Sequence, residues 1–288
     1  MGINASGPDF DELIRHLAPT TDTKMIAGDF SKFDIGISAD AMGAAFQVMS
    51  SLADRCLDYN KEDLRMMDML ANEVMNPVVA YHGALLQLSG SNPSGQNMTV
   101  YVNSLVNSLY HRCVYRRLCG PSNQKFRDVY RLTTYGDDSL GAPIPAVADK
   151  MTFNNIKATF ADVDIKYTPA DKSEDAPDFV TLDVVDFLKR RPIFNPELDL
   201  WMGALDIKSI VKSLHCSANT TLPPDAAAIV NLDNSLREMF NHGRDAYEDW
   251  RIKVGLIADD HNLRHDLSLL GYDFDAYLAR YRERYLRN

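Results

Sequence analysis

The strongest constraint on how this chain folds is the four-residue turn Tyr135-Gly136-Asp137-Asp138, which lies between two strand-length runs. The runs cover residues 129–134 and 139–144 and are typical of two strands joined by a tight turn. Gly136 lets the backbone take such a turn without steric strain. The segment therefore predicts a β-hairpin whose tip carries two adjacent carboxylates.

A second acidic segment, Ala27-Gly-Asp-Phe-Ser-Lys-Phe-Asp34, overlaps a predicted strand at residues 24–29. Asp29 ends that strand, and Asp34 follows five residues later. Two aspartates brought together from separate strands make a hard oxygen site suited to Mg²⁺. The alternative is an ordinary solvated turn, since Gly-Asp-Asp arises by chance in roughly one chain of this length in ten or twenty.

A third segment combines a loop, 89–95, with a helix predicted from about residue 97 to 118. Thr99, Asn103 and Asn107 are spaced i, i+4, i+8, so they fall along one face of that helix. Spacing alone leaves two interpretations open. The stripe is either a solvated polar face or a hydrogen-bonding face beneath a ribose, with the Ser94-Gly95 loop presenting backbone donors.

The other segments are predicted from periodicity and turn residues. Helices are expected at 38–59, 61–75 and 149–160, and strands at 78–81, 84–88 and 165–168. Residues 179–187 are expected to be mostly extended, and the pattern after Pro192 is helical to the end. An α+β layer is thus predicted for roughly the first 190 residues and a helical domain for the rest.

Charge argues against nucleic-acid binding by this chain unless a basic part lies outside it. The formal net charge is -10, whereas a protein that holds RNA by its phosphates usually shows a basic face. No apolar run approaches the roughly 18 residues needed to span a bilayer. No transmembrane segment is therefore expected.

Taken in order, the motifs DxxxxD, SGxxxTxxxN and GDD resemble motifs A, B and C of positive-strand RNA virus polymerases. Thr168-Pro-Ala-Asp-Lys172-Ser resembles motif D of the picornavirus-like enzymes, and Phe187-Leu-Lys-Arg190 resembles motif E. Five motifs in the right order are far more specific than any one of them. The segments GDFSKFD, PSGQNMTVYVNS and YGDDSLG are similar in sequence to the same motifs in the dicistrovirus-like and marine RNA virus branch.

The resemblance implies a polymerase palm, a central antiparallel sheet backed by helices, followed by an all-helical thumb. The palm with motifs A to E is expected over residues 1–193, with 76–91 as a remnant of the fingers insertion, and the thumb over 194–288. Only 28 residues precede Asp29, and none forms the basic motif F of the fingers. The fingers are therefore expected to be largely absent, and the chain to be an incomplete polymerase whose independent activity is uncertain.

The resemblance also implies residue roles. The catalytic and metal-binding group is Asp29, Asp137, Asp138 and the carbonyl of Phe30, with Lys172 as general acid toward the leaving pyrophosphate. The nucleotide- and ribose-binding group is Asp34, Ser94, Gly95, Thr99 and Asn103. Lys189 and Arg190 would bind the RNA primer. The alternatives are a surface lysine at 172 and a solvated basic corner at 189–190.

The implied function is RNA-dependent RNA synthesis in viral genome replication, by two-metal nucleotidyl transfer from NTPs to an RNA 3′ end. Mg²⁺ is the expected cofactor, with Mn²⁺ as an alternative. Expected partners are RNA template and primer, NTPs, a protein primer and other viral replication proteins, at replication complexes in the host cell cytoplasm. Two rivals stay open: a reverse transcriptase-like palm, and a non-catalytic palm–thumb fragment that binds RNA or proteins.

Overall fold

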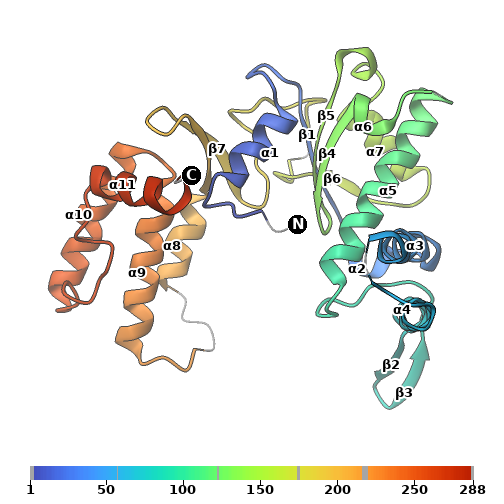
Figure 1. Cartoon of the computed structure of the whole chain (residues 1–288), viewed down its shortest axis with the longest axis horizontal. Helices are drawn as coiled ribbons and strands as arrows, with labels where there is room; N and C mark the ends of the chain where they lie inside the picture. The colour runs from blue at the N-terminus through green and yellow to red at the C-terminus, as the bar shows by residue number, and fades with distance from the viewer. Residues whose placement is uncertain (1–2, 57, 122, 174–175, 216–219, 287–288) are drawn as a thin grey trace. The chain divides into compact units, whose positions relative to one another are not determined.

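The computed structural model describes residues 3–56, 58–121, 123–173, 176–215 and 220–286, whose helices and strands are labelled in Figure 1. The chain forms two compact units. The first runs from Thr23 to Val180, and the second combines Gly2–Asp22 with Thr181–Asn288. The predicted subdomain boundary at 193–194 stays a prediction.

The first unit is built on a four-stranded antiparallel sheet in the order β4-β5-β1-β6. Its strands are β1 (Ile26–Phe30), β4 (Tyr130–Tyr135), β5 (Asp138–Pro143) and β6 (Tyr167–Pro169). All four were predicted from the sequence, with ends that differ by one or two residues. This sheet places the turn between β4 and β5 beside the end of β1.

Helices α5 (Thr99–Cys119) and α7 (Phe153–Ala161) pack against one face of this sheet, and α6 (Phe126–Val129) contacts the edge strand β4. The unit also contains α2 (Phe33–Gly36), α3 (Ala39–Cys56), which packs on α5, and α4 (Lys61–Met75), which packs on α3, with a 3₁₀ turn η1 at Pro145–Val147. Along β1, Ile26 and Phe30 are buried in the core beneath α5 and α7. Because side chains alternate along a strand, Asp29 projects from the opposite face.

A buried tyrosine ties three strands together next to the acidic residues. The ring of Tyr167 crosses Gly28, where an added Cβ would lie 2.1 Å from the ring. Ser139 Oγ donates to the carbonyl of Gly28 at 3.1 Å and lies 2.7 Å from the Tyr167 hydroxyl. Only glycine fits at position 28, because β1 is crossed there by the ring from β6.

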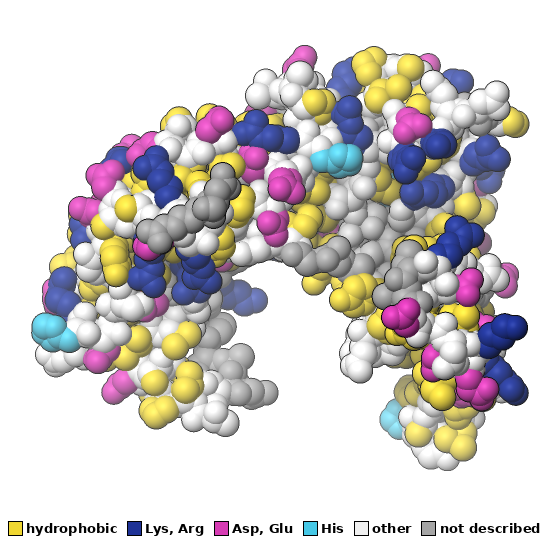
Figure 2. Space-filling model, viewed as in Figure 1, with side chains coloured by type: hydrophobic (Ala, Val, Ile, Leu, Met, Phe, Trp, Pro, Cys, Tyr) yellow, Lys and Arg dark blue, Asp and Glu magenta, His cyan; other side chains and the backbone are white. Residues whose placement is uncertain are grey.

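The predicted hairpin at 78–88 is present as β2 (Val78–Tyr81) and β3 (Ala84–Gln87). His82 and Gly83 both have positive φ, as a two-residue hairpin turn requires. Its side chains are exposed, and Figure 2 shows apolar ones on this hairpin. The assignment of 76–91 as a remnant of the fingers stays a prediction.

The second unit contains α1 (Asp9–Leu17), β7 (Arg190–Asn195), β8 (Leu200–Leu205), α8 (Ile207–His215), α9 (Pro224–Phe240), α10 (Arg244–Asp260) and α11 (Phe274–Tyr285). The prediction of helix directly after Pro192 was wrong, because β7 and β8 pair as an antiparallel hairpin. Its loop is closed by Asn195, whose Oδ1 accepts from the N–H groups of Glu197 and Leu198.

Residues 179–187 were predicted to be mostly extended, and the structure bears this out only at their ends, where Val180 and Phe187 form isolated bridges, the latter with Arg190. Val180 forms a single bridge with Met25. The N–H groups of Val184 and Val185 then both donate to the carbonyl of Thr181, which makes a turn. Among the described helices, none combines the length and apolar character needed to cross a membrane.

Candidate active site

The structure brings Asp29 and Asp137 together. Gly28 on β1 lies opposite Ser139 on β5, so the next residue, Asp29, reaches the level of the β4–β5 turn. Burial and the neighbouring Asp137 carboxyl, which is within hydrogen-bonding reach, raise the pKa of Asp29, while Lys172 acts in the opposite direction. The Asp137 carboxylate thus disfavours the charge on Asp29, and a cation between the two would relieve that repulsion.

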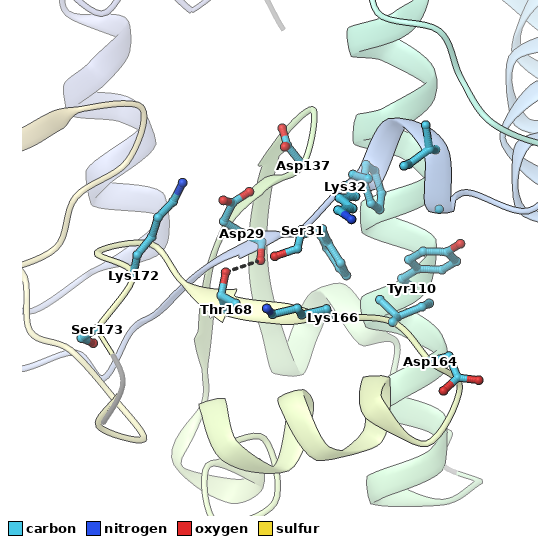
Figure 3. A pocket seen from close by; sticks show the side chains of 15 residues that line it. Asp29, Ser31, Lys32, Tyr110, Asp137, Asp164, Lys166, Thr168, Lys172 and Ser173 are labelled. Carbon is cyan, nitrogen blue, oxygen red and sulfur yellow. Dashed lines mark hydrogen bonds between the residues drawn. The ribbon is translucent and has the colours of Figure 1, made fainter.

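These residues open onto a pocket of about 960 Å³ (Figure 3). Lys172 lines the pocket with its ammonium exposed and electrostatically coupled to Asp29. Thr168, opposite Asp29 on β6, donates its hydroxyl to the Asp29 carbonyl at 3.2 Å. The predicted general acid therefore lies beside the predicted metal ligands, although its role stays a prediction.

The β4–β5 turn is held from below by helix α5. The amide nitrogen of Asn107 lies 3.1, 3.0 and 3.2 Å from the carbonyl oxygens of Gly136, Asp137 and Asp138. Ser104 Oγ accepts from the N–H of Gly136 at 2.8 Å. One side-chain amide thus faces every carbonyl of the Gly-Asp-Asp segment, which positions the two carboxylates.

The sequence placed Asn107 on the polar stripe of this helix, either as a solvated residue or as part of a ribose-binding face, and did not predict its contact with the β4–β5 turn. The helical face on which Asn107 lies could be predicted, since a residue four positions after Asn103 lies on the same face one turn further along. The partner of its amide could not be predicted, because the turn that it contacts is about 30 residues away in the chain.

His111 supports this clamp from one helical turn further along α5. Its ring is fully buried, and Nδ1 lies 3.0 Å from the carbonyl of Asn107. Burial lowers the pKa of His111 to about 4. The ring is therefore neutral near pH 7, and Nδ1 carries the hydrogen that it donates to the carbonyl.

The predicted ribose network is partly assembled, through a residue that the sequence did not single out. Asn92 is fully buried, and its amide donates to Asn103 Oδ1 at 2.7 Å while its backbone N–H donates to the Asp34 carbonyl at 2.6 Å. Ser94 Oγ lies 3.5 Å from the Asp34 carboxylate. Asn92 thus connects the DxxxxD segment to the helix that follows the Ser94-Gly95 loop.

Gly95 lies outside these direct contacts, whereas Thr99 joins them through its backbone, since Asn92 Nδ2 lies 3.3 Å from the Thr99 carbonyl oxygen. The Thr99 hydroxyl lies 2.9 and 2.7 Å from the carbonyls of Pro93 and Gln96, where it closes the loop at the start of α5. Gly95 has φ +100 and nothing near its Cβ position. The loop therefore depends on glycine for its backbone conformation, and the nucleotide-binding role of both residues stays a prediction.

Lys189 and Arg190 belong to the second unit and differ in their surroundings. Arg190 donates to both carboxylate oxygens of Glu238, at 2.7 and 2.9 Å, and to the carbonyl of Gly203 at 2.7 Å. Lys189 is exposed. The charge of Arg190 is thus already neutralised within its own unit, and the primer-binding role of both residues stays a prediction.

Asp29 and Asp137 offer carboxylate oxygens of the kind that divalent metal ions bind. Among the described residues, no group of three or more His, Cys, Asp or Glu side chains is placed to hold an ion. Mg²⁺ is usually bound by one or two carboxylates, with waters and substrate phosphates as its other ligands. Asp29 and Asp137 match that pattern. Asp138 begins β5 next to them, and Phe30, whose carbonyl was predicted as a further ligand, is the last residue of β1.

Comparison with known proteins agrees with this geometry. The sequence model of the viral RNA-dependent RNA polymerase family matches residues 1–256. The chain is 27% identical over 284 residues to the replicase polyprotein of Drosophila C virus and 26% identical over 289 residues to that of Cricket paralysis virus. These matches cover 95% and 96% of this chain but 16% of each polyprotein.

The fold also matches a solved structure, the Sicinivirus 3Dpol RNA-dependent RNA polymerase, with a TM-score of 0.70 at 15% identity. That match covers 99% of this chain and 56% of the solved one, so the chain spans little more than half of that polymerase. The predicted picornavirus-like resemblance and the palm-like α+β fold are both confirmed. The marine branch stays a prediction.

Proposed function

The chain belongs to the viral RNA-dependent RNA polymerase family, and from this premise we propose that its acidic site catalyses template-directed transfer of nucleotides from NTPs to an RNA 3′ end. One observation carries the proposal. Asp29 and Asp137, more than a hundred residues apart in the sequence, have their carboxyl groups within hydrogen-bonding reach at one end of the sheet, beside the β4–β5 turn.

Asp29 and Asp137 would hold two Mg²⁺ ions, with Asp138 and the Phe30 carbonyl as further oxygen ligands and Mn²⁺ as an alternative ion. When bound, such ions activate the primer 3′ hydroxyl and stabilise the charge of the leaving pyrophosphate. The clamp from Asn107 keeps the turn in one position, so that the carboxylates are already placed for cations. Lys172, beside Asp29, would donate a proton to the departing pyrophosphate.

Asp34, Ser94, Asn103 and Thr99 would read the ribose. The buried Asn92 connection supports this, because it holds Asp34 and Asn103 in one hydrogen-bonded group. Asp34→Ala should therefore reduce the preference for ribonucleotides over deoxyribonucleotides by about tenfold, the value of one charge-assisted hydrogen bond. Competition between NTP and dNTP incorporation measures this, and an unchanged ratio would remove Asp34 from sugar selection.

The wider setting follows from the same proposal. The partners would be RNA template and primer and NTPs, together with a protein primer and other viral replication proteins. The site of action would be replication complexes in the host cell cytoplasm. Lys189 would contact the primer backbone, and Arg190 would do so only if it also leaves Glu238.

The decisive test is primer extension with Mg²⁺ on a defined RNA template, by this chain and by a longer polymerase that contains it. Asp137→Asn should lower nucleotide addition by about a thousandfold or more, since several kcal/mol of charge stabilisation depend on the ions. Residual synthesis close to the unmodified rate would defeat the proposal.

The same experiment separates the rivals. Extension by the longer polymerase alone would make this chain a fragment that needs the rest of the enzyme. Synthesis from dNTPs in preference to NTPs would favour a reverse transcriptase-like palm. Binding of Mn²⁺ that disappears in Asp137→Asn would show an intact metal site even where extension is absent.

A further inference from the structure

Three lysines share the pocket with the acidic pair. Lys32, Lys166 and Lys172 all line it, together with Asp29, Asp137 and Asp164 (Figure 3). The motif resemblance assigned a role to Lys172 but none to Lys32 or Lys166. Among the described residues, none of the three ammonium groups forms an ion pair with a carboxylate. Described carboxylates and ammonium groups thus line the same pocket without forming ion pairs with one another.

The strand register explains where Lys166 lies. β1 and β6 pair Asp29 with Thr168 and Phe30 with Tyr167, and the N–H of Ser31 continues the ladder by donating to the Lys166 carbonyl at 3.0 Å. Side chains two residues apart point to the same face. Lys166 therefore projects from the same face as Asp29, one repeat of about 7 Å further along the strand pair.

Lys32 reaches the same pocket through a turn. Its φ of 53 lies in the left-handed region, where the chain leaves β1 and starts α2. Non-glycine residues adopt this conformation infrequently, and it redirects the chain directly after the strand. Lys32 thus lines the pocket directly after Ser31, whose N–H donates to the Lys166 carbonyl.

The third carboxylate does not neutralise these lysines. Asp164 lines the pocket near Tyr110, whereas Figure 3 shows the Lys166 side chain extended toward Thr168. One end of the pocket therefore has two carboxylates that need cations, and the adjoining wall has ammonium groups that lack an anion. A polyphosphate chelated by Mg²⁺ satisfies both ends, because its metal meets the carboxylates and its outer oxygens meet the lysines.

We propose that Lys32 and Lys166 bind the β- and γ-phosphates of the incoming NTP and hold the pyrophosphate that leaves. This rests on the proposed function, and it adds two binding residues to that reaction. Lys172 acts as the proton donor, whereas Lys32 and Lys166 bind as fixed positive charges.

The first test measures binding without polymerisation. Inorganic tripolyphosphate with Mg²⁺ is titrated by calorimetry into the full chain and into Lys32→Gln, Lys166→Gln and the double variant. Each single change should weaken binding about tenfold, as expected for the loss of a charge-assisted contact. Lys32→Arg and Lys166→Arg keep the charge and should bind within about threefold of the unmodified chain.

The matched control is Lys61→Gln, which makes the same charge change at the exposed start of α4, outside the pocket. It should bind tripolyphosphate as the unmodified chain does. A double variant that binds within twofold of the unmodified chain would overturn the proposal. So would a failure of the unmodified chain to bind tripolyphosphate at all, or an equal loss in Lys61→Gln.

The second test uses primer extension by the longer polymerase. The double variant should raise the KM for NTP by about a hundredfold while kcat falls much less, because ground-state phosphate contacts are lost. If the double variant shows an unchanged KM and normal activity, Lys32 and Lys166 do not bind the NTP phosphates, and the proposed function still stands. Activity that survives in Asp137→Asn would instead defeat the proposed function, whatever the lysine variants do.

Discussion

The pocket in the first unit and the helical second unit treat charged side chains in opposite ways. In the pocket, Asp29 and Asp137 face each other, and among the described residues none of the three lysines forms an ion pair with a carboxylate. In the second unit, Arg244 donates to both Glu197 and Asp275, and Arg190 donates to both oxygens of Glu238.

The difference shows that charged side chains serve the stability of the fold in the second unit and the binding of a ligand in the pocket. Within the folded chain each paired charge compensates its partner, and this matters most where the loss of one member would leave a buried charge uncompensated, as for Arg190 and Glu238 with 16% and 20% of their side chains exposed. Unpaired charges that converge do not stabilise the fold, but they offer binding free energy to a ligand. Such convergence in a pocket is therefore evidence of function rather than of stability.

The largest expected effect comes from disturbing the clamp beneath the acidic turn. Asn107→Asp keeps the shape of the side chain but replaces the amide with a carboxylate that faces three carbonyl oxygens about 3 Å away. The turn should move, and a displacement near 1 Å is enough to lower kcat by about a hundredfold to a thousandfold. Primer extension and Mn²⁺ affinity, measured on the same preparation, test this.

The control for Asn107→Asp is Thr159→Val, which removes a buried hydrogen bond to the Asn155 carbonyl in α7 of the same unit. It should lower stability and leave both kcat and Mn²⁺ affinity unchanged. If the two variants lose activity in proportion to their lost stability, Asn107 contributes to folding alone, and the contrast between the two regions weakens.

The next effect tests the paired charges. Arg190→Met leaves Glu238 without its cation in a largely buried position, so the free energy of unfolding should fall by about 2–3 kcal/mol. Lys189→Met is the matched change next in the chain at an exposed side chain and should have almost no effect on stability. Urea unfolding of both variants gives the comparison.

The same pair of variants tests the predicted primer contacts. Weaker binding of primer RNA in Lys189→Met, with unchanged stability, would support a contact at that residue. Equal stability of the two variants would contradict the structural role of Arg190 as the cation that neutralises Glu238.

The smallest effect is a pH dependence that arises from His111. Its folded pKa of about 4 lies below the ordinary value near 6.5, so the unfolded chain binds more protons between these values. Stability should therefore fall as the pH is lowered, by about 2 kcal/mol between pH 7 and pH 5. Asp29, whose pKa is raised, contributes with the opposite sign.

The contribution of His111 to the pH dependence is isolated by comparing the unfolding free energy of the unmodified chain with that of a His111→Phe variant. The variant removes the titrating group but keeps a ring packed against Phe30 and Tyr167. Its unfolding free energy should depend less on pH, by about that 2 kcal/mol, over the same range. Identical pH profiles of the two proteins would show that His111 does not supply the dependence.

Local sequence signals predicted most elements of the first unit. The α4 helix was predicted at its observed bounds, and its Asn60–Asp63 capping box shows why such a start is readable from sequence. The β7–β8 hairpin was missed because its turn depends on Asn195, whose side chain was not recognised as a turn former. The sequence also left the polar stripe at 99, 103 and 107 with two equal interpretations.

The tertiary structure resolved that stripe into three different uses. Thr99 closes a loop, Asn103 joins Asn92 and Asp34, and Asn107 clamps the metal turn. These uses could not be separated beforehand, because the three residues share a helical face but contact different segments, from Gln96 for Thr99 to the distant β4–β5 turn for Asn107.

By itself, the sequence determined that the acidic groups of the site lie at a strand end and a tight turn, since such features depend on a few neighbouring residues. Only the tertiary structure decided that Asp29 meets Asp137, that Lys166 follows Asp29 on the same face, and that Arg190 is neutralised by Glu238. The reason is strand register and packing between distant segments: a shift of one residue would turn Asp29 into the core, and no local pattern specifies that alignment.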